Sequence, residues 1–136
     1  SIERGLLKWQ EECFLVFTTK ETYGVQAKLG IVGLLNLTVT VVLIGAETAS
    51  RKWVKYEIKR SHERGNGLLG VYIHKLKDKN GNTDRKGDNP FDNFYVEQGG
   101  MKIYLSDIYP TYDWVDDNGY ENFGGWVEKA AREAGR

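Results

Sequence analysis

The sequence has little cysteine, little proline and no long apolar run. A single cysteine, Cys13, excludes an internal disulfide, and it has no zinc-site spacing with the two histidines. The longest apolar runs, residues 34–37 and 39–45, are far too short to span a bilayer. The first residues carry mixed charge and lead into no secretory signal. These absences predict a reducing, cytoplasmic location and no contact with a membrane.

An excess of one charge is also missing, since 19 basic and 19 acidic residues give a net charge of zero. This balance argues against a nucleic-acid partner, because duplex binding usually needs a broad basic surface. The charge is nevertheless uneven: residues 51–90 carry eleven basic and five acidic groups, whereas residues 91–136 carry four and nine. The basic middle is either a solvated face or a local field that attracts a phosphate-bearing small molecule.

The hydrophobic pattern predicts one α/β domain over residues 1–136, with a small, mainly parallel sheet flanked by helices. Strands are expected at residues 13–19, 38–45, 67–74 and 101–105, and helices at residues 2–12, 23–36, 51–64 and 120–134. The β-branched run at 38–45 is typical of a strand buried on both faces. The helix after it has Ser50 or Thr48 as its N-cap and Gly65 as its stop, so residues 38–74 form a right-handed βαβ unit.

In the last third of the chain, the sequence pattern predicts less regular structure. Residues 75–93 are expected to form a polar loop, residues 101–105 an edge strand, and residues 109–118 an aromatic connection. The side chains expected to face the core from the closing helix are Tyr120, Phe123, Val127 and Ala131.

Glu57 breaks the pattern of its predicted helix. At about 100° per residue it falls among apolar residues such as Trp53 and Ile58, while the lysines occupy the opposite side. Carboxylates are rarely buried without a partner, so Glu57 should have one or favour its protonated form. One interpretation is an internal cap or an ion pair; the available cations are Arg51, Arg60 and Arg64. The other is a pocket carboxylate at the carboxyl end of parallel strands, where open α/β sheets bind ligands. The helical wheel leaves both open.

Two adjoining segments resemble the TIR-like family, and in particular the TIR-domain proteins of the Thoeris anti-phage system. They are residues 38–48, Thr-Val-Thr-Val-Val-Leu-Ile-Gly-Ala-Glu-Thr, and residues 50–61, Ser-Arg-Lys-Trp-Val-Lys-Tyr-Glu-Ile-Lys-Arg-Ser. Further matches are Gly70-Val71 with Ile73, Lys86-Gly87 with Asn89-Pro90-Phe91-Asp92, residues 112–120, and Trp126-Val127-Glu128. The resemblance covers residues 38–136 and leaves residues 1–37 atypical, because the opening strand motif of the family is missing. Either residues 13–19 stand in for that strand or a stretch is absent.

The resemblance implies a flavodoxin-like TIR-type domain that acts on nicotinamide adenine dinucleotide (NAD). Family members cleave the bond between nicotinamide and ribose, and Thoeris members join the product into a cyclic ADP-ribose isomer. That cyclic nucleotide then signals to a partner effector protein during phage infection. NAD is the substrate, and neither a cofactor nor a metal is required.

The resemblance also implies roles for individual residues. The catalytic glutamate of the family lies in a Trp-Val-x-x-Glu helix, and this position is Glu57. Thr48 and Ser50, at the strand-to-helix turn, could donate to phosphate or ribose near the helix N-terminus. Trp53 either walls the pocket or simply packs in the core.

Two other functions remain open at this point. Many TIR domains are non-enzymatic adaptors, and a neutral chain with separate basic and acidic segments could form head-to-tail homo-oligomers. A domain that senses a nucleotide without converting it is the third alternative. Glu57 discriminates between them, since only an enzyme needs its carboxylate for chemistry.

Overall fold

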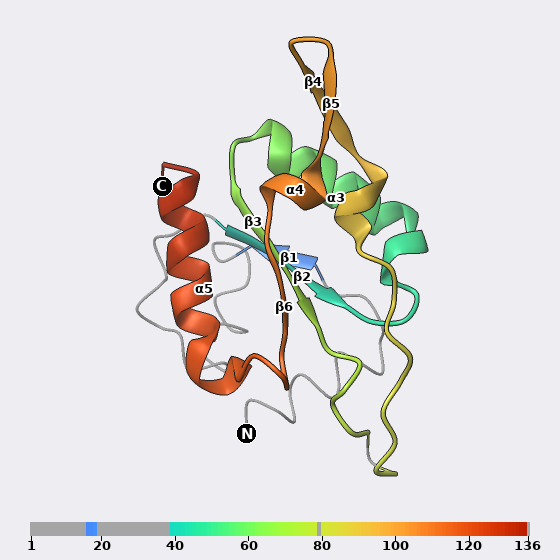
Figure 1. The fold of residues 1–136 in the computed structure, drawn as a ribbon. Helices are drawn as coiled ribbons and strands as arrows, with labels where there is room; N and C mark the ends of the chain where they lie inside the picture. The colour runs from blue at the N-terminus through green and yellow to red at the C-terminus, as the bar shows by residue number, and fades with distance from the viewer. Residues whose placement is uncertain (1–15, 19–38, 79, 136) are drawn as a thin grey trace.

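The structure is a computed structural model that describes residues 16–18, 39–78 and 80–135 (Figure 1). The helices predicted at residues 2–12 and 23–36 lie outside the described residues, as does most of the strand predicted at residues 13–19. What the structure describes of that strand is β1, Val16–Thr18.

A four-stranded sheet in the order β1-β2-β3-β6 forms the centre of the described fold. Strand β2 (Val39–Ile44) pairs in parallel with β3 (Gly67–Tyr72), in a register that begins at Val39–Gly67 and ends at Ile44–Tyr72. Strand β6 (Thr111–Asp113) runs parallel to β3, whereas β1 runs antiparallel to β2. The prediction of an α/β fold with a mainly parallel sheet is therefore confirmed.

Every residue of β2 and β3 is buried, because helices cover both faces of the sheet (Figure 1). Alternate residues of β2 point to opposite sides. Val41 packs in a cluster with α5 (Gly119–Glu133), and Val42 packs in a second cluster with α3 (Lys52–Glu63). The continuous apolar run of β2 thus has the burial that was predicted from it.

Helix α3 follows β2 as predicted, but its start differs. A short 3-10 turn, η2 (Thr48–Ser50), precedes it, and Arg51 is the N-cap residue. The prediction of Ser50 or Thr48 as side-chain cap is wrong, because both hydroxyls bind to backbone groups of the connecting loop instead. Gly65, at a φ of 73°, follows the last helical turn and confirms the predicted stop.

The segment predicted as an edge strand pairs elsewhere. Strand β5 (Met101–Tyr104) forms a separate antiparallel hairpin with β4 (Tyr95–Gln98), and this hairpin projects from the body of the domain (Figure 1). Gly99 and Gly100 both have positive φ, which is the conformation that a tight two-residue hairpin turn needs. The Gly-Gly pair is therefore the sequence signal from which this hairpin could have been predicted.

The remaining elements refine the prediction for the last third. A 3-10 turn, η3 (Pro90–Asn93), ends the predicted polar loop, and a short helix, α4 (Leu105–Ile108), follows β5. Strand β6 lies within the predicted aromatic connection, which is therefore partly a strand. Helix α5 buries Phe123, Val127 and Ala131 as expected, but Tyr120 is 60% exposed because it lies in the first turn, facing away from the core.

One buried hydrogen bond ties helix α3 to the sheet. The hydroxyls of Thr40 on β2 and Ser61 on α3 share a hydrogen bond of 2.7 Å. We expect Ser61→Ala to lower the free energy of unfolding by about 1–3 kcal/mol, because the Thr40 hydroxyl would be buried without its partner. Urea denaturation of Ser61→Ala, of Thr40→Val and of the double variant Thr40→Val/Ser61→Ala measures this. The double variant should recover part of the loss, and a loss equal to the sum of both single losses would contradict the pairing.

No helix within the described ranges has the length and apolarity needed to cross a bilayer.

Candidate functional site

The connection from β2 to α3 lies at the carboxyl end of the parallel strands. Thr48 is fully buried there: its Oγ1 accepts a hydrogen bond from the Gly45 amide at 2.8 Å and donates to the Leu43 carbonyl at 3.4 Å. Both bonds return to the backbone at the end of β2. Thr48 therefore fixes the shape of the turn from within it, and its hydroxyl does not project toward a ligand.

Neighbouring segments hold the outside of the same connection. Ser50 is exposed, and its hydroxyl donates to the Glu47 carbonyl at 2.9 Å. The Glu47 carboxylate forms an ion pair with Arg85, and the Asn93 side chain donates to the Ala49 carbonyl at 3.2 Å. The loop that follows β3 and the η3 turn thus position the residues that lead into α3.

Glu57 lies one turn after Trp53 on α3, at the border of the buried face. The buried residues of the helix are Val54, Ile58 and Ser61, while the Glu57 side chain is 29% exposed. The prediction that Glu57 is buried among apolar side chains is therefore only partly right, because the buried stripe is narrower than the wheel indicated. Its Oε1 lies 3.8 Å from Arg60 Nη1, so the carboxylate has one of the cationic partners expected from the sequence.

Trp53 is 40% exposed, which excludes simple core packing as its role. It precedes Glu57 by four residues, and side chains at this spacing share one face of a helix. The structure thus places Ser50, Trp53 and Glu57 in one stretch at the surface of the domain, with Thr48 beneath it. Within the described residues no cluster of histidine, cysteine or carboxylate side chains could hold a metal ion.

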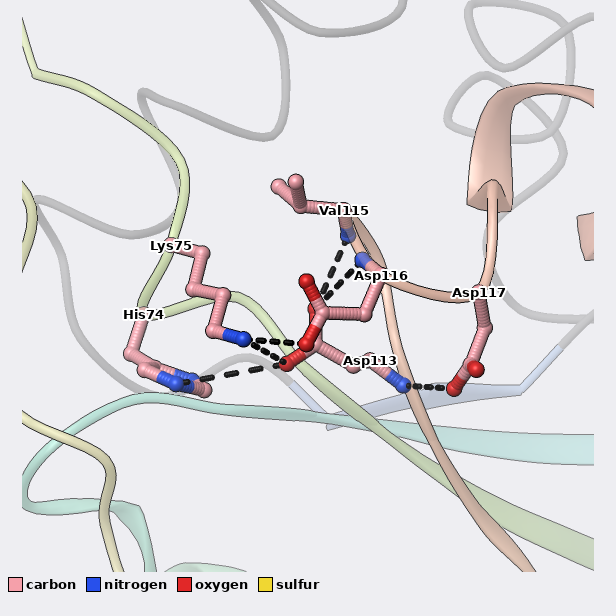
Figure 2. Close-up of polar contacts among 6 residues, drawn as sticks. All are labelled: His74, Lys75, Asp113, Val115, Asp116 and Asp117. Carbon is pink, nitrogen blue, oxygen red and sulfur yellow. Dashed lines mark hydrogen bonds and ion pairs between the residues drawn. The ribbon is translucent and has the colours of Figure 1, made fainter.

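A separate group of polar side chains follows β3 and β6, at the same end of the parallel strands as the β2–α3 connection (Figure 2). His74 is buried; its Nε2 lies 4.0 Å from Asp113 Oδ2, and its Nδ1 has no hydrogen-bond partner among the described residues. Lys75 forms an ion pair with Asp116 and lies 3.9 Å from Asp113 Oδ2. The hydrogen bond to Asp116 raises the pKa of Lys75, so this side chain stays a cation.

The backbone of the β6–α5 loop fixes this group. Asp113 Oδ1 accepts hydrogen bonds from the amides of Val115 at 3.0 Å and Asp116 at 2.9 Å, and Asp117 Oδ2 accepts one from the Asp113 amide at 2.7 Å (Figure 2). The sequence pattern did not single out His74 and gave no reason to connect it to Asp113. The signal that could have found the group is Asp-Trp-Val-Asp-Asp, because aspartates commonly bind the amides of a turn.

Tyr72, the last residue of β3, lies between the β2–α3 connection and the group formed by His74, Lys75 and Asp113. Burial raises its pKa above the usual value of about 10, and the nearby Asp92 carboxylate adds to the effect. The Lys86 ammonium lies 4.5 Å from the centre of the Tyr72 ring, within the range of a cation–π interaction. A cation is thus held beside the connection that leads to α3.

The raised pKa of Tyr72 gives a prediction for alkaline stability. Well below pH 10 the Tyr72 hydroxyl is protonated in both the folded and the unfolded chain, and its contribution to the free energy of unfolding is fully present. Above pH 10 the unfolded chain ionises first, so the free energy of unfolding should fall as the pH rises toward the folded pKa. Urea denaturation between pH 8 and 11 should show a shallower fall for Tyr72→Phe than for the unmodified chain. The exposed Tyr56 supplies the matched control: Tyr56→Phe should leave the slope unchanged, and equal slopes for all three proteins would contradict the prediction.

Comparison with known proteins adds two findings. The family model of the TIR-like domain of the Thoeris protein ThsB matches residues 17–78. The chain is also 39% identical to ThsB1 of Bacillus cereus (strain MSX-D12), a protein named as a candidate cyclic ADP-D-ribose synthase. That alignment covers 70% of this chain and 68% of the relative. The matched residues 17–78 include the β2–α3 connection and the whole of α3.

Proposed function

Because this chain belongs to the Thoeris ThsB family of TIR-like proteins, we propose that it cleaves NAD and forms a cyclic ADP-ribose-type signal in anti-phage defence. The name of the Bacillus cereus relative supports the reaction. The observation that carries the proposal is the position of Glu57, on the helix that follows the carboxyl end of β2 and with its carboxylate partly exposed. Open α/β sheets bind their ligands at this end.

Glu57 is the catalytic residue of the proposed reaction. Breaking the bond between ribose C1′ and the nicotinamide ring nitrogen sends the bonding electrons to nicotinamide, which leaves uncharged. The ribose then develops an oxocarbenium-like positive charge, as in glycoside cleavage. A carboxylate beside the ribose stabilises that charge and accepts hydrogen bonds from the ribose hydroxyls. Arg60 Nη1, 3.8 Å from Glu57 Oε1 on the same helix, helps to orient the Glu57 side chain.

The nucleophile decides the product. A ring nitrogen of the adenine attacks C1′ in the cyclising reaction, whereas water attacks it in hydrolysis and releases a proton. A site that excludes water therefore favours the cyclic product. Trp53, four residues before Glu57 and 40% exposed, walls the ribose side of the site.

The β2–α3 connection binds the polar parts of the dinucleotide. Ser50 carries the exposed hydroxyl of this connection; it donates to the Glu47 carbonyl in the structure and turns to donate to a ribose or phosphate oxygen when the dinucleotide binds. Thr48, buried and bound to the backbone of β2, shapes the turn from below. The reaction needs no resident cofactor and no metal, since the positive charge of the transition state is met by a carboxylate. The cyclic nucleotide carries the signal to an effector protein, and homo-oligomers of the chain are a further expected partner.

Incubation of the purified chain with NAD, followed by chromatography with mass detection, tests the proposal. We expect release of nicotinamide and a product with the mass of cyclic ADP-ribose. ADP-ribose without the cyclic product would support cleavage and overturn cyclisation. If the folded chain binds other TIR domains but leaves NAD intact, the non-enzymatic adaptor is the correct alternative.

A further inference from the structure

A pocket of about 300 Å³ lies at the amino end of β3, at the opposite end of this strand from the β2–α3 connection. Residues from the C-terminal turns of α3, α4 and α5 surround it, and Gly67 at the start of β3 forms part of its wall. Gly67 permits a close approach of the strand to α5, since a Cβ there would lie 2.7 Å from the Ala130 carbonyl oxygen. The volume of this pocket is at the lower limit of the volumes that are typical of small-molecule binding sites.

A hydrogen-bonded pair of side chains fixes one wall of this pocket. His62 Nδ1 and the Tyr109 hydroxyl share a hydrogen bond of 2.6 Å, and their rings meet edge to face at 5.8 Å. Burial raises the pKa of Tyr109, so its hydroxyl stays protonated at neutral pH. Because Nδ1 is engaged, the other ring nitrogen of His62 is the one that remains for a ligand. The pair therefore presents an oriented hydrogen-bonding group beside an aromatic ring.

The rest of the lining defines the chemistry of the ligand. Leu68, Ile108 and Ala130 provide an apolar surface, and Glu133 adds a carboxylate at the edge. Among the residues that the structure describes, no lysine or arginine lines the pocket. Glu133 is already paired with Lys129, whose Nζ lies 3.9 Å from its Oε1, so the pair offers no net positive charge to a phosphate, and the dinucleotide and its cyclic product do not fit this lining. A flat, uncharged ring with hydrogen-bonding groups at its edge fits this lining.

We propose that this pocket is a second, non-catalytic binding site for a small uncharged heteroaromatic amide. The ring would pack against Tyr109 and the apolar surface, and the amide would bind the free nitrogen of His62 and the Glu133 carboxylate. Nicotinamide, the leaving group of the proposed reaction, belongs to this class and is a suitable probe. Only the choice of probe rests on the proposed function, because the pocket itself is independent of Glu57 and of catalysis.

Titration of the ¹⁵N-labelled full chain with nicotinamide tests the site, and the Glu57→Gln variant is used so that turnover cannot interfere. We expect saturable shifts of the amide signals of Gly65, Gly67 and Ala134. Tyr109→Phe should weaken the binding about tenfold, because it frees His62 from its partner and removes a hydroxyl. Ala134→Trp should abolish it by filling the pocket, and Glu128→Gln, exposed on the same helix and outside the lining, is the matched control that should bind as before.

Two results would overturn the proposal. The first is the absence of saturable shifts around Gly67 in a chain whose spectrum shows it to be folded. The second is a set of shifts confined to residues 45–57, which would place nicotinamide at the proposed catalytic site alone. Binding at Gly67 in a chain that never cleaves NAD would overturn the proposed function and leave this inference standing.

Discussion

Glu57→Gln should reduce nicotinamide release from NAD by about 10²–10⁴-fold. Glutamine keeps the size and the hydrogen-bonding oxygen of the side chain but removes the negative charge that stabilises the oxocarbenium-like ribose. Stability should change little, because the ion pair of Glu57 with Arg60 is 3.8 Å long and both side chains are about one third exposed. The measurement is the initial rate of nicotinamide formation, with thermal unfolding recorded on the same samples.

Glu63→Gln is the matched control for this variant. Glu63 lies on the same helix, is exposed, and differs from Glu57 in lying in the last turn, away from the β2–α3 connection. We expect it to keep the full rate. Equal rates for Glu57→Gln and the unmodified chain would remove Glu57 from the mechanism, and equal losses in both variants would show that the net charge of α3 matters rather than one carboxylate.

The central part of the fold could be predicted from the sequence because its signals are local and strong. The β-branched run of β2 has no other stable environment than a sheet covered on both faces, and Gly65 marks the end of α3 through its positive φ. Strand β6 was missed because it has only three residues and its pairing with β3 is a long-range contact. A short aromatic segment has no periodicity by which a strand could be recognised.

The candidate site was predictable in position and less so in detail. The segment from Thr48 to Glu57 was identified correctly as a continuous stretch at the strand-to-helix turn, yet the wheel overestimated the burial of Glu57. A wheel reports direction around the helix axis, whereas burial depends on how far the neighbouring elements extend over that face. The association of His74 with Asp113 and Lys75 depends on the pairing of β3 with β6, and no local pattern encodes it.

Gly87→Ala should lower the free energy of unfolding by about 1–3 kcal/mol and reduce NAD cleavage as well. A Cβ at position 87 would lie 2.2 Å from the Gly45 carbonyl oxygen and 3.1 Å from that of Ala46. Both oxygens belong to the backbone at the end of β2, so no side-chain rotation can relieve the overlap. The connection must move, and with it the turn that Thr48 holds and the start of the helix that carries Glu57.

Gly125→Ala is the control that separates this local effect from the general effect of replacing a glycine. Gly125 lies on the exposed side of α5, and a Cβ there would meet nothing within 4 Å. Alanine is the better helix former by about 1 kcal/mol, so this variant should be slightly more stable and fully active. Urea denaturation gives the two stabilities, and NAD cleavage measured well below both unfolding midpoints separates misplacement of the site from unfolding. A Gly87→Ala protein with unchanged stability and rate would show that the connection after β2 tolerates displacement and does not position Glu57.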